Sequence, residues 1–307
     1  MNIGVAGTHA AGFFLLSHFC HGRAHGRPVL IDMFSRRPLP AKGFTIIENT
    51  RQRRISPGSF TVAHRAKNLD CLFLLDSGAP LKPLLNQGRP MLARGGFFVN
   101  LSQVAGPSRE IQKWAKPHPV VFAFLNGSAD AIKDGRIAWE AMARRPTLGI
   151  HRGASLSPAI GRLVQFLNSV SLGFGWEQGP LDDLLWSRAA WAASFGPTSV
   201  LLRKTYGEIL ESEPAKEMAA RALEETASIM RAGSRRLIFD AARPWPDSLA
   251  GPAKEHRPLM FQEFVQGRRS AADAVLGPFI NRARERRLPC PVLTKFYAML
   301  KAYEKHS

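Results

Sequence analysis

The residues best placed to do chemistry lie near the start of the chain, between Gly7 and Gly12. These glycines follow a short apolar run, Ile3–Ala6, and the stretch Ala10–His21 after the first glycine predicts an amphipathic helix. In the G-x-G-x-x-G turn that binds dinucleotides, the first glycine makes the turn, the second admits the pyrophosphate, and the third lets helix and strand pack closely. Here His9 takes the second place, so an imidazole is expected where the phosphates should rest. We expect the cofactor-binding turn to consist of Gly7, Thr8, His9, Ala10, Ala11 and Gly12.

The residues after the second predicted strand bear on which cofactor would bind. Asp32 lies near the spacing of the acid that grips a ribose 2′-hydroxyl, and Arg36 and Arg37 follow it. Because guanidinium groups match a 2′-phosphate, we expect Arg36 and Arg37 to favour NADP over NAD. Three further arginines are expected at the same edge: Arg51, Arg53 and Arg54. The alternative is that these arginines form a solvated surface.

Two kinds of pattern divide the chain into halves. Short apolar runs predict strands over Ile3–Ala6, Pro28–Phe34, Phe44–Glu48, Ser59–His64, Leu69–Asp76, Phe97–Leu101, Val120–Phe124, Thr147–Ile150 and Gly173–Trp176, with a helix over Ser157–Val170. The near-continuous apolar run Leu69–Asp76 is typical of a strand buried in a parallel sheet. From about Pro180 the spacing becomes helical, over Leu181–Ser194, Thr198–Leu210, Pro214–Ala232, Leu259–Glu263, Ala271–Arg287 and Pro291–Tyr303, with an irregular connection at Asp240–Pro258. The patterns predict an α/β, Rossmann-like dinucleotide-binding domain over residues 1–179 and an all-α substrate or dimerisation domain over residues 180–307.

Composition narrows the classes of partner. The 307 residues carry a net charge of +18, a field that attracts phosphates and other anions. The basic residues are scattered and form no known nucleic-acid-binding pattern, so the charge indicates a phosphorylated ligand, an anionic partner or simply a basic protein. No apolar run is long enough to span a membrane, and no signal peptide is indicated. Three widely spaced cysteines are typical of a reducing compartment, and we expect the protein in the cytoplasm.

Segments along nearly the whole chain keep the order and spacing of one enzyme family's motifs. Beyond the Ile3–Gly12 turn they are Leu148-Gly149-Ile150, Leu185-Trp186-Ser187-Arg188, Gly196-Pro197-Thr198-Ser199-Val200-Leu201, Tyr206-Gly207-Glu208, Met260-Phe261-Gln262-Glu263, Gly267-Arg268-Arg269-Ser270, Gly277 and Leu288–Thr294. In these segments the chain resembles the ketopantoate reductase (2-dehydropantoate 2-reductase) family. The resemblance implies a Rossmann domain followed by a helical domain, with NADPH and a 2-oxo acid meeting in the cleft. It also implies hydride transfer to a ketone that a lysine then protonates.

The chain departs from the family where the chemistry is done. The family's lysine falls on Arg188, and an arginine can hold a carboxylate or carbonyl but is a poor proton donor. The resemblance implies that Gln103 stands near the asparagine that contacts cofactor and substrate. The other polar positions of the family, two asparagines, a serine, a glutamate and a second lysine, fall on Ala192, Gly196, Leu259, Ala271 and Ser77. The apolar positions of the scaffold are kept while its polar ones are not.

Two functions follow as hypotheses. In the first, the protein is an NADP-dependent oxidoreductase of this type that acts on a 2-oxo acid or related carbonyl other than ketopantoate, with Arg188 holding the substrate. In the second, it is a non-catalytic or repurposed homologue (a pseudoenzyme) that binds a ligand or a protein partner in the interdomain cleft. By analogy with the family we expect a homodimer.

The histidines that follow the turn have a spacing that could suit a metal ion. His18, His21 and His25 would share one face if the first helix ran on, but Gly22 and Gly26 argue that it ends earlier. No partner carboxylate lies nearby in the sequence. We therefore expect no metal and interpret these histidines as solvent-facing residues at a helix end.

Overall fold

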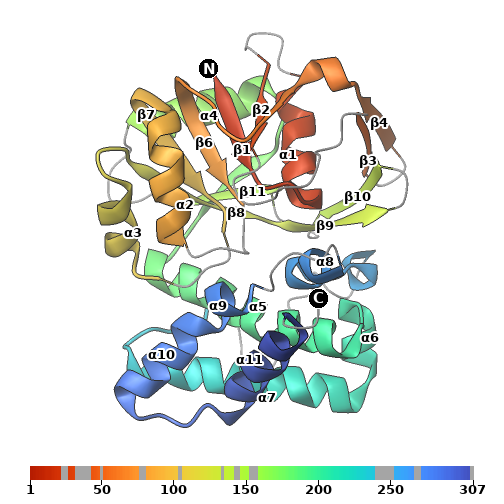
Figure 1. The fold of residues 1–307 in the computed structure, drawn as a ribbon, viewed down its shortest axis with the longest axis vertical. Helices are drawn as coiled ribbons and strands as arrows, with labels where there is room; N and C mark the ends of the chain where they lie inside the picture. The colour runs from red at the N-terminus through yellow and green to blue at the C-terminus, as the bar shows by residue number, and fades with distance from the viewer. Residues whose placement is uncertain are drawn as a thin grey trace. The chain divides into compact units, whose positions relative to one another are not determined.

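A computed structural model shows the fold and describes residues 1–21, 27–31, 43–48, 51–75, 81–102, 106–132, 135–141, 146–151, 158–238, 252–265 and 271–304 (Figure 1). The chain forms two compact units. The first contains Met1–Asp76, Lys82–Ser102 and Ile111–Gln178, and the second contains Ser77–Leu81, Gln103–Glu110 and Gly179–Ser307. The first is a mixed α/β unit and the second is helical, which confirms the predicted fold class. The exact domain boundary at residues 179 and 180 stays a prediction.

The larger sheet of the first unit has the order of a doubly wound fold. Its strands are β1 (Ile3–Ala6), β2 (Val29–Ile31), β5 (Thr61–Ala63), β6 (Leu69–Leu74), β7 (Leu92–Asn100), β8 (Val120–Leu125), β11 (Leu148–His151) and β12 (Phe174–Glu177). They lie in the order β12-β11-β8-β7-β6-β1-β2-β5, and every neighbouring pair is parallel except β8 and β11. The strand order therefore reverses direction between β1 and β6. Ligands of open α/β sheets bind beyond the carboxyl ends of the strands at such a switch point.

A second, four-stranded sheet was only partly predicted. It contains β3 (Phe44–Glu48), β4 (Arg51–Ile55), β9 (Gly127–Ile132) and β10 (Arg136–Ala141) in the order β4-β3-β10-β9. Trp139 of β10 is fully buried and stacks on Phe14 with 3.8 Å between ring centroids. Gly127 makes this possible, because a Cβ there would lie 2.3 Å from the indole of Trp139. The aromatic stack therefore attaches the second sheet to the helix that carries Phe14.

The arginines expected beside the end of the second strand lie instead along β4. This strand is the edge of the second sheet and pairs only with β3, in an antiparallel hairpin. Arg53 faces Glu48 of the same hairpin, with 4.0 Å between Nη2 and Oε2. The arrangement gives no support to the expectation that Arg51, Arg53 and Arg54 converge on a ribose. A charged edge strand instead discourages pairing with another chain.

The first unit contains α1 (Ala10–Phe19) and α4 (Pro158–Ser169) and most of α2 (Leu81–Gly88) and α3 (Ser108–Ala115), with short 3-10 turns at Pro57–Ser59 and Arg89–Met91. Helix α1 ends two residues before the predicted end at His21, because Cys20 and His21 form a turn. Helices α2 and α3 were not predicted. In α3 only Ile111 and Ala115 are buried, which leaves too weak an apolar stripe for recognition from sequence.

The second unit is built around one long helix. Its helices are α5 (Leu181–Leu202), α6 (Tyr206–Glu211), α7 (Glu213–Ala232), α8 (Leu259–Val265), α9 (Ala272–Val275), α10 (Gly277–Arg286) and α11 (Pro291–Glu304), with a 3-10 turn at Pro252–Glu255. In this unit α5 packs against α7, α8 and α11. Figure 1 shows α7 and α11 beside each other below α5. The predicted irregular connection Asp240–Pro258 falls mainly outside the described residues.

Two of the predicted helix boundaries in this unit are wrong. Helix α5 runs through Pro197, although a proline cannot donate the backbone hydrogen bond expected there. Every residue from Ala192 to Val200 is buried, and this packing keeps the helix whole despite the missing bond. Conversely, the helix predicted over Ala271–Arg287 divides at Leu276, where α9 ends and the Gly-Pro start of α10 follows.

Candidate functional site

The two glycines of the first turn are each required by the local geometry. Gly7 has φ of +153°, and a Cβ at this position would lie 3.0 Å from Cβ of Leu75. A Cβ on Gly12 would lie 1.9 Å from the carbonyl oxygen of Gly7, which no side chain tolerates. The turn of β1 into α1 is therefore as close as it is in dinucleotide-binding folds, where the first and third glycines do these two jobs.

The amino end of α1 suits an anion. The first-turn amides of a helix have no acceptor within the helix, and the helix dipole favours negative charge there. His9 is the N-cap residue, its side chain makes no capping bond, and the first turn contains no acidic residue. Among the described residues, the backbone N–H groups at Ala10–Gly12 are therefore candidates for binding an anion such as a phosphate.

The side chain of His9 reaches across the switch point. Its Nε2–H donates to the carbonyl oxygen of Leu75 (3.2 Å), directly after β6, and the residue is only 2% exposed. This places the imidazole between the carboxyl ends of β1 and β6, where the strand order reverses. A cofactor seated there must displace the ring or pass beside it. His9 thus lies at the switch point and has a specific partner there, the carbonyl oxygen of Leu75.

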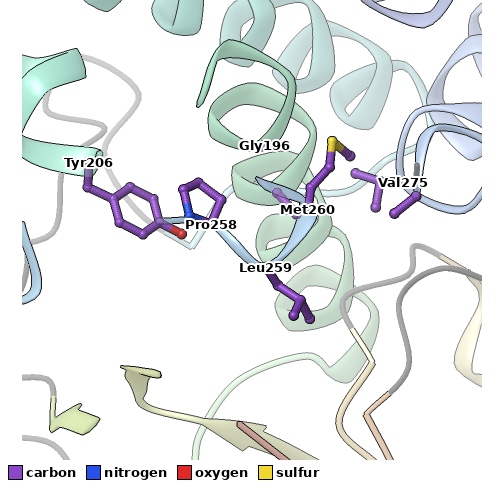
Figure 2. A pocket seen from close by; sticks show the side chains of 8 residues that line it. Gly196, Tyr206, Pro258, Leu259, Met260 and Val275 are labelled. Carbon is purple, nitrogen blue, oxygen red and sulfur yellow. The ribbon is translucent and has the colours of Figure 1, made fainter. Parts of the chain in front are cut away.

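A small pocket lies within the second unit (Figure 2). The described residues that line it are Ala192, Gly196, Tyr206, Pro258, Leu259, Met260, Ala271 and Val275, from α5, α6, α8, α9 and the segments before them. Its volume is about 10 Å³, room for roughly one water molecule. Four of its lining residues, Ala192, Gly196, Leu259 and Ala271, stand where the resemblance places polar side chains. The structure therefore brings these four substituted positions together in one pocket, and none of them gives it a polar side chain.

Tyr206 is the only described lining residue with a titratable side chain. Burial raises the pKa of Tyr206 to about 12, while a hydrogen bond from the side chain of Trp191 acts in the opposite direction. The phenol is therefore protonated at neutral pH. Because the indole N–H of Trp191 can only donate, the Tyr206 oxygen accepts this bond and its own O–H can point elsewhere. In the sequence, Tyr206 stands out only as part of the Tyr206-Gly207-Glu208 motif, which gives no sign that it lines a pocket.

Arg188 lies on the same face of α5 as the pocket, one helical turn before Ala192. Residues 188, 192 and 196 are spaced by four, which aligns them along one side of the helix. The Arg188 side chain is half-buried and already takes part in an interaction within the chain. Its guanidinium supplies a permanent positive charge near this side of the helix, but no transferable proton at neutral pH.

Several predicted site residues lie outside the described part of the chain: Asp32, Arg36, Arg37, Ser77 and Gln103. The same holds for His25 of the considered metal site. No group of metal-ligating side chains occurs among the described residues.

The other two histidines of that group, His18 and His21, both make contacts within the first unit. His18 is buried against Phe14, so its interpretation as solvent-facing is wrong, and Nδ1–H of His21 donates to the carbonyl oxygen of Ser17 (2.8 Å). Burial, with a smaller effect of the Arg53 charge, lowers the pKa of His18 to about 4.

None of the described helices combines the length and apolar character needed to cross a membrane.

Comparison with protein families identifies the second unit. Residues 181–304 match the model of the ketopantoate reductase PanE/ApbA C-terminal domain. This match confirms the resemblance inferred from the motifs, and it covers the helices that line the pocket. No curated protein sequence matches the chain.

Solved structures of low sequence identity share the fold over the whole chain. A PanE/ApbA family ketopantoate reductase from Ralstonia eutropha JMP134 is 16% identical with a TM-score of 0.75, covering 100% of this chain and 99% of that one. A D-mandelate dehydrogenase with NADH and anilino(oxo)acetate is 16% identical with a TM-score of 0.78 and the same coverage. The dimeric ketopantoate reductase from Staphylococcus aureus is 16% identical with a TM-score of 0.70, again covering 100% and 99%. These similarities show a common fold.

Proposed function

We propose that the chain, whose residues 181–304 match the C-terminal domain of the ketopantoate reductase family of oxidoreductases, is an NADP-dependent reductase of a 2-oxo acid or related carbonyl other than ketopantoate. The observation that carries the proposal is the pocket of the second unit. Four of the lining positions at which the resemblance implies polar side chains hold apolar side chains or none, at Ala192, Gly196, Leu259 and Ala271. A polar substrate would lose its hydrogen-bond partners there, whereas an apolar one would lose none.

The residues of the first unit fit a dinucleotide. The close turn at Gly7 and Gly12 and the uncapped amino end of α1 would hold the pyrophosphate. We assign the 2′-phosphate of NADP to Arg36 and Arg37 and a contact to the nicotinamide end to Gln103, as the resemblance implies. When bound, the cofactor supplies a hydride. The structure of D-mandelate dehydrogenase with NADH is one instance of a nicotinamide cofactor on this fold.

Arg188 would bind the substrate in this proposal. A guanidinium pairs well with a carboxylate, and its charge also stabilises an oxygen that becomes negative as a ketone is reduced. Because arginine is a poor proton donor, the proton must reach the product oxygen from water or from another group. The reaction class is therefore that of the family, with a changed substrate and a changed proton source.

The proposal is tested by cofactor binding and by turnover. NADPH at a hundred times its Kd should stabilise the protein by about 2.7 kcal/mol and raise Tm by several degrees, and NADH should do so less at equal concentration. With NADPH present, at least one 2-oxo acid with an apolar side chain should cause NADPH to be consumed and the matching hydroxy acid to form. An unchanged Tm at saturating NADPH would refute the reductase proposal.

A second candidate function is a non-catalytic homologue that binds a ligand or partner protein. Two observations favour it: His9 crosses the crevice to Leu75, and Arg188 replaces the proton donor. Tight NADPH binding without oxidation by any 2-oxo acid would support this candidate over the reductase. In either case we propose a cytoplasmic homodimer, by analogy with the dimeric reductase from Staphylococcus aureus, which sedimentation can test.

A further inference from the structure

Two arginine side chains meet at the carboxyl end of α7. A Cβ built on Gly233, the C-cap residue of this helix, would lie 2.8 Å from Nη1 of Arg235 and 3.3 Å from Nη2 of Arg282. Arg235 belongs to the segment that follows α7, whereas Arg282 lies on α10, which packs against α7 (Figure 1). The two guanidinium groups therefore come together from different elements of the second unit. Because like charges repel, this approach costs free energy unless negative charge offsets it.

The acidic side chains beside these arginines offset the charge only in part. Nη2 of Arg235 is 3.9 Å from Oδ2 of Asp182, too far for a hydrogen bond, and Oδ1 of this carboxylate accepts the backbone N–H of Ser108 (2.8 Å). Nη1 of Arg282 is 3.4 Å from Oε2 of Glu285, whose side chain is 64% exposed, and solvent weakens such a pair. Residues 231–236 and 282–287 together contain seven arginines, and Glu285 is their only acidic residue. Positive charge is therefore in excess in these two segments.

The end of α7 explains one of the contacts but not the whole arrangement. A cation is favoured at the carboxyl end of a helix, and Nη1 of Arg235 donates to the carbonyl oxygen of Gly233 (3.2 Å). The Nε–H groups of Arg235 and Arg282, however, are both buried and find no acceptor in the described part of the chain. The indole N–H of Trp186 is a third buried donor of this kind. Because buried donors without an acceptor are rare in native proteins, these three point to an acceptor from outside the chain.

Aromatic rings hold the two arginines in place. The guanidinium of Arg235 lies over the ring of Trp186, 5.0 Å from its centroid. Trp186 in turn meets Phe279 edge-on, with 5.2 Å between ring centroids, and Phe279 lies on α10 one turn before Arg282. The side chain of Arg235 is 15% exposed and that of Arg282 is 29% exposed, so both are partly shielded from solvent and still reachable from it. Charge-assisted hydrogen bonds are strong in such surroundings.

We propose that Arg235 and Arg282 form a binding site for a phosphate group, either free or carried by a small molecule. A water molecule accepts hydrogen bonds but does not offset two positive charges. A phosphate group carries a charge of about −1.5 to −2 at neutral pH, and its acceptor oxygens match the geometry of guanidinium donors. Such a ligand would connect the end of α7 with α10. The site is distinct from the turn of Gly7 and Gly12 and depends on neither the cofactor nor reductase activity.

Calorimetric titration of the full chain with inorganic phosphate, at constant ionic strength in a chloride buffer, tests this site. The wild-type protein should show saturable binding, and its Tm should rise with phosphate concentration. Arg282→Gln removes one of the two charged donors and should weaken binding about tenfold or more. The matched control is Arg221→Gln, at an arginine of α7 whose side chain is 65% exposed, and it should leave Kd unchanged. No saturable binding by the wild-type protein, or an unchanged Kd in Arg282→Gln, would overturn the inference.

A second pair of variants leaves every charge in place. Gly233→Ala adds a Cβ 2.8 Å from Nη1 of Arg235, so this guanidinium must move away. It should weaken phosphate binding at least severalfold, whereas Gly161→Ala, where a Cβ meets nothing within 4 Å, should not. Circular dichroism and Tm without phosphate establish that the variants are folded. A folded Gly233→Ala protein that binds phosphate as tightly as the wild-type protein contradicts the proposed geometry.

Titrations with other anions at the same ionic strength identify the kind of ligand. Tighter binding of glycerol 3-phosphate than of inorganic phosphate would support a phosphorylated small molecule, and the reverse order would support free phosphate. Malonate carries two carboxylates, and tighter binding of malonate than of either phosphate compound would refute the assignment to phosphate. Phosphate bound instead at the amino end of α1 would keep its Kd in Arg282→Gln, which counts against the site. None of these outcomes bears on the proposed reductase, which is tested by NADPH.

Discussion

Replacing His9 by glycine should have opposite effects on stability and on cofactor binding. The Nε2–H of His9 donates a buried hydrogen bond to Leu75 (3.2 Å), and a bond of this kind contributes about 0.5–1.5 kcal/mol net to stability. His9→Gly removes this bond, and a glycine at the N-cap position costs little more. The variant should therefore lose about 1 kcal/mol in free energy of unfolding, measured by urea denaturation without ligand.

The same substitution should tighten NADPH binding. In the wild-type protein a dinucleotide at the switch point must compete with the imidazole for the space between β1 and β6, and breaking the bond to Leu75 reduces affinity by about 2- to 13-fold. Glycine at position 9 restores the residue that admits the pyrophosphate. We expect Kd for NADPH to fall by about this factor in fluorescence titrations.

The matched control is His64→Gly, which removes an exposed histidine from the same unit. It should change neither the Kd for NADPH nor the direction of the cofactor-induced Tm shift. If His9→Gly binds NADPH no more tightly than the wild-type protein, the imidazole does not obstruct the site and this reasoning is refuted. Weaker binding would instead indicate that His9 contacts the cofactor directly.

Three further predictions concern the two units separately. Arg188→Lys should raise kcat for a reducible 2-oxo acid about tenfold or more, because an ammonium can donate the proton that arginine retains; an unchanged kcat in steady-state assays would exclude a proton-transfer limit at this position. Burial lowers the pKa of His18 from 6.5 to about 4, so between these pH values the unfolded chain binds a proton that the folded chain does not. The free energy of unfolding should therefore fall as pH decreases from 6.5 to 4, and it should fall less in His18→Phe. Equal slopes of the two proteins in pH-dependent denaturation would contradict this. Trp139→Ala should cost about 3–5 kcal/mol in free energy of unfolding by removing the stack on Phe14; a loss under 1 kcal/mol by urea denaturation would show that the stack is not what holds the second sheet.

The parts of the fold that could be predicted are those with a local signal. The run Leu69–Asp76 is apolar except at Asp70 and Asp76 because β6 is buried in the middle of a parallel sheet, and the observed strand covers Leu69–Leu74. By contrast, β4 contains three arginines in five residues and becomes a strand only through pairing with β3. The break predicted at Gly196-Pro197 is wrong for a related reason, because the packing of the buried residues around Pro197 keeps α5 continuous.

The candidate site divides in the same way. The turn at Gly7 and Gly12 could be predicted, because the spacing of the two glycines directly after a short apolar run is itself a local signal. The pocket could not, because its lining comes from separate helices and apolar side chains carry no chemical signature in a sequence. The positions Ala192 and Ala271 stood out only by contrast with the family's polar residues. Only the folded structure shows that they line one pocket.

The most direct test of the account is one comparison of kcat/KM for the wild-type protein. NADPH consumption and hydroxy acid formation are measured with 3,3-dimethyl-2-oxobutanoate and with ketopantoate under the same conditions. The account predicts turnover of the first acid, with kcat/KM about ten- to a hundredfold higher than for ketopantoate. Turnover of neither acid, or a preference for ketopantoate, would contradict it.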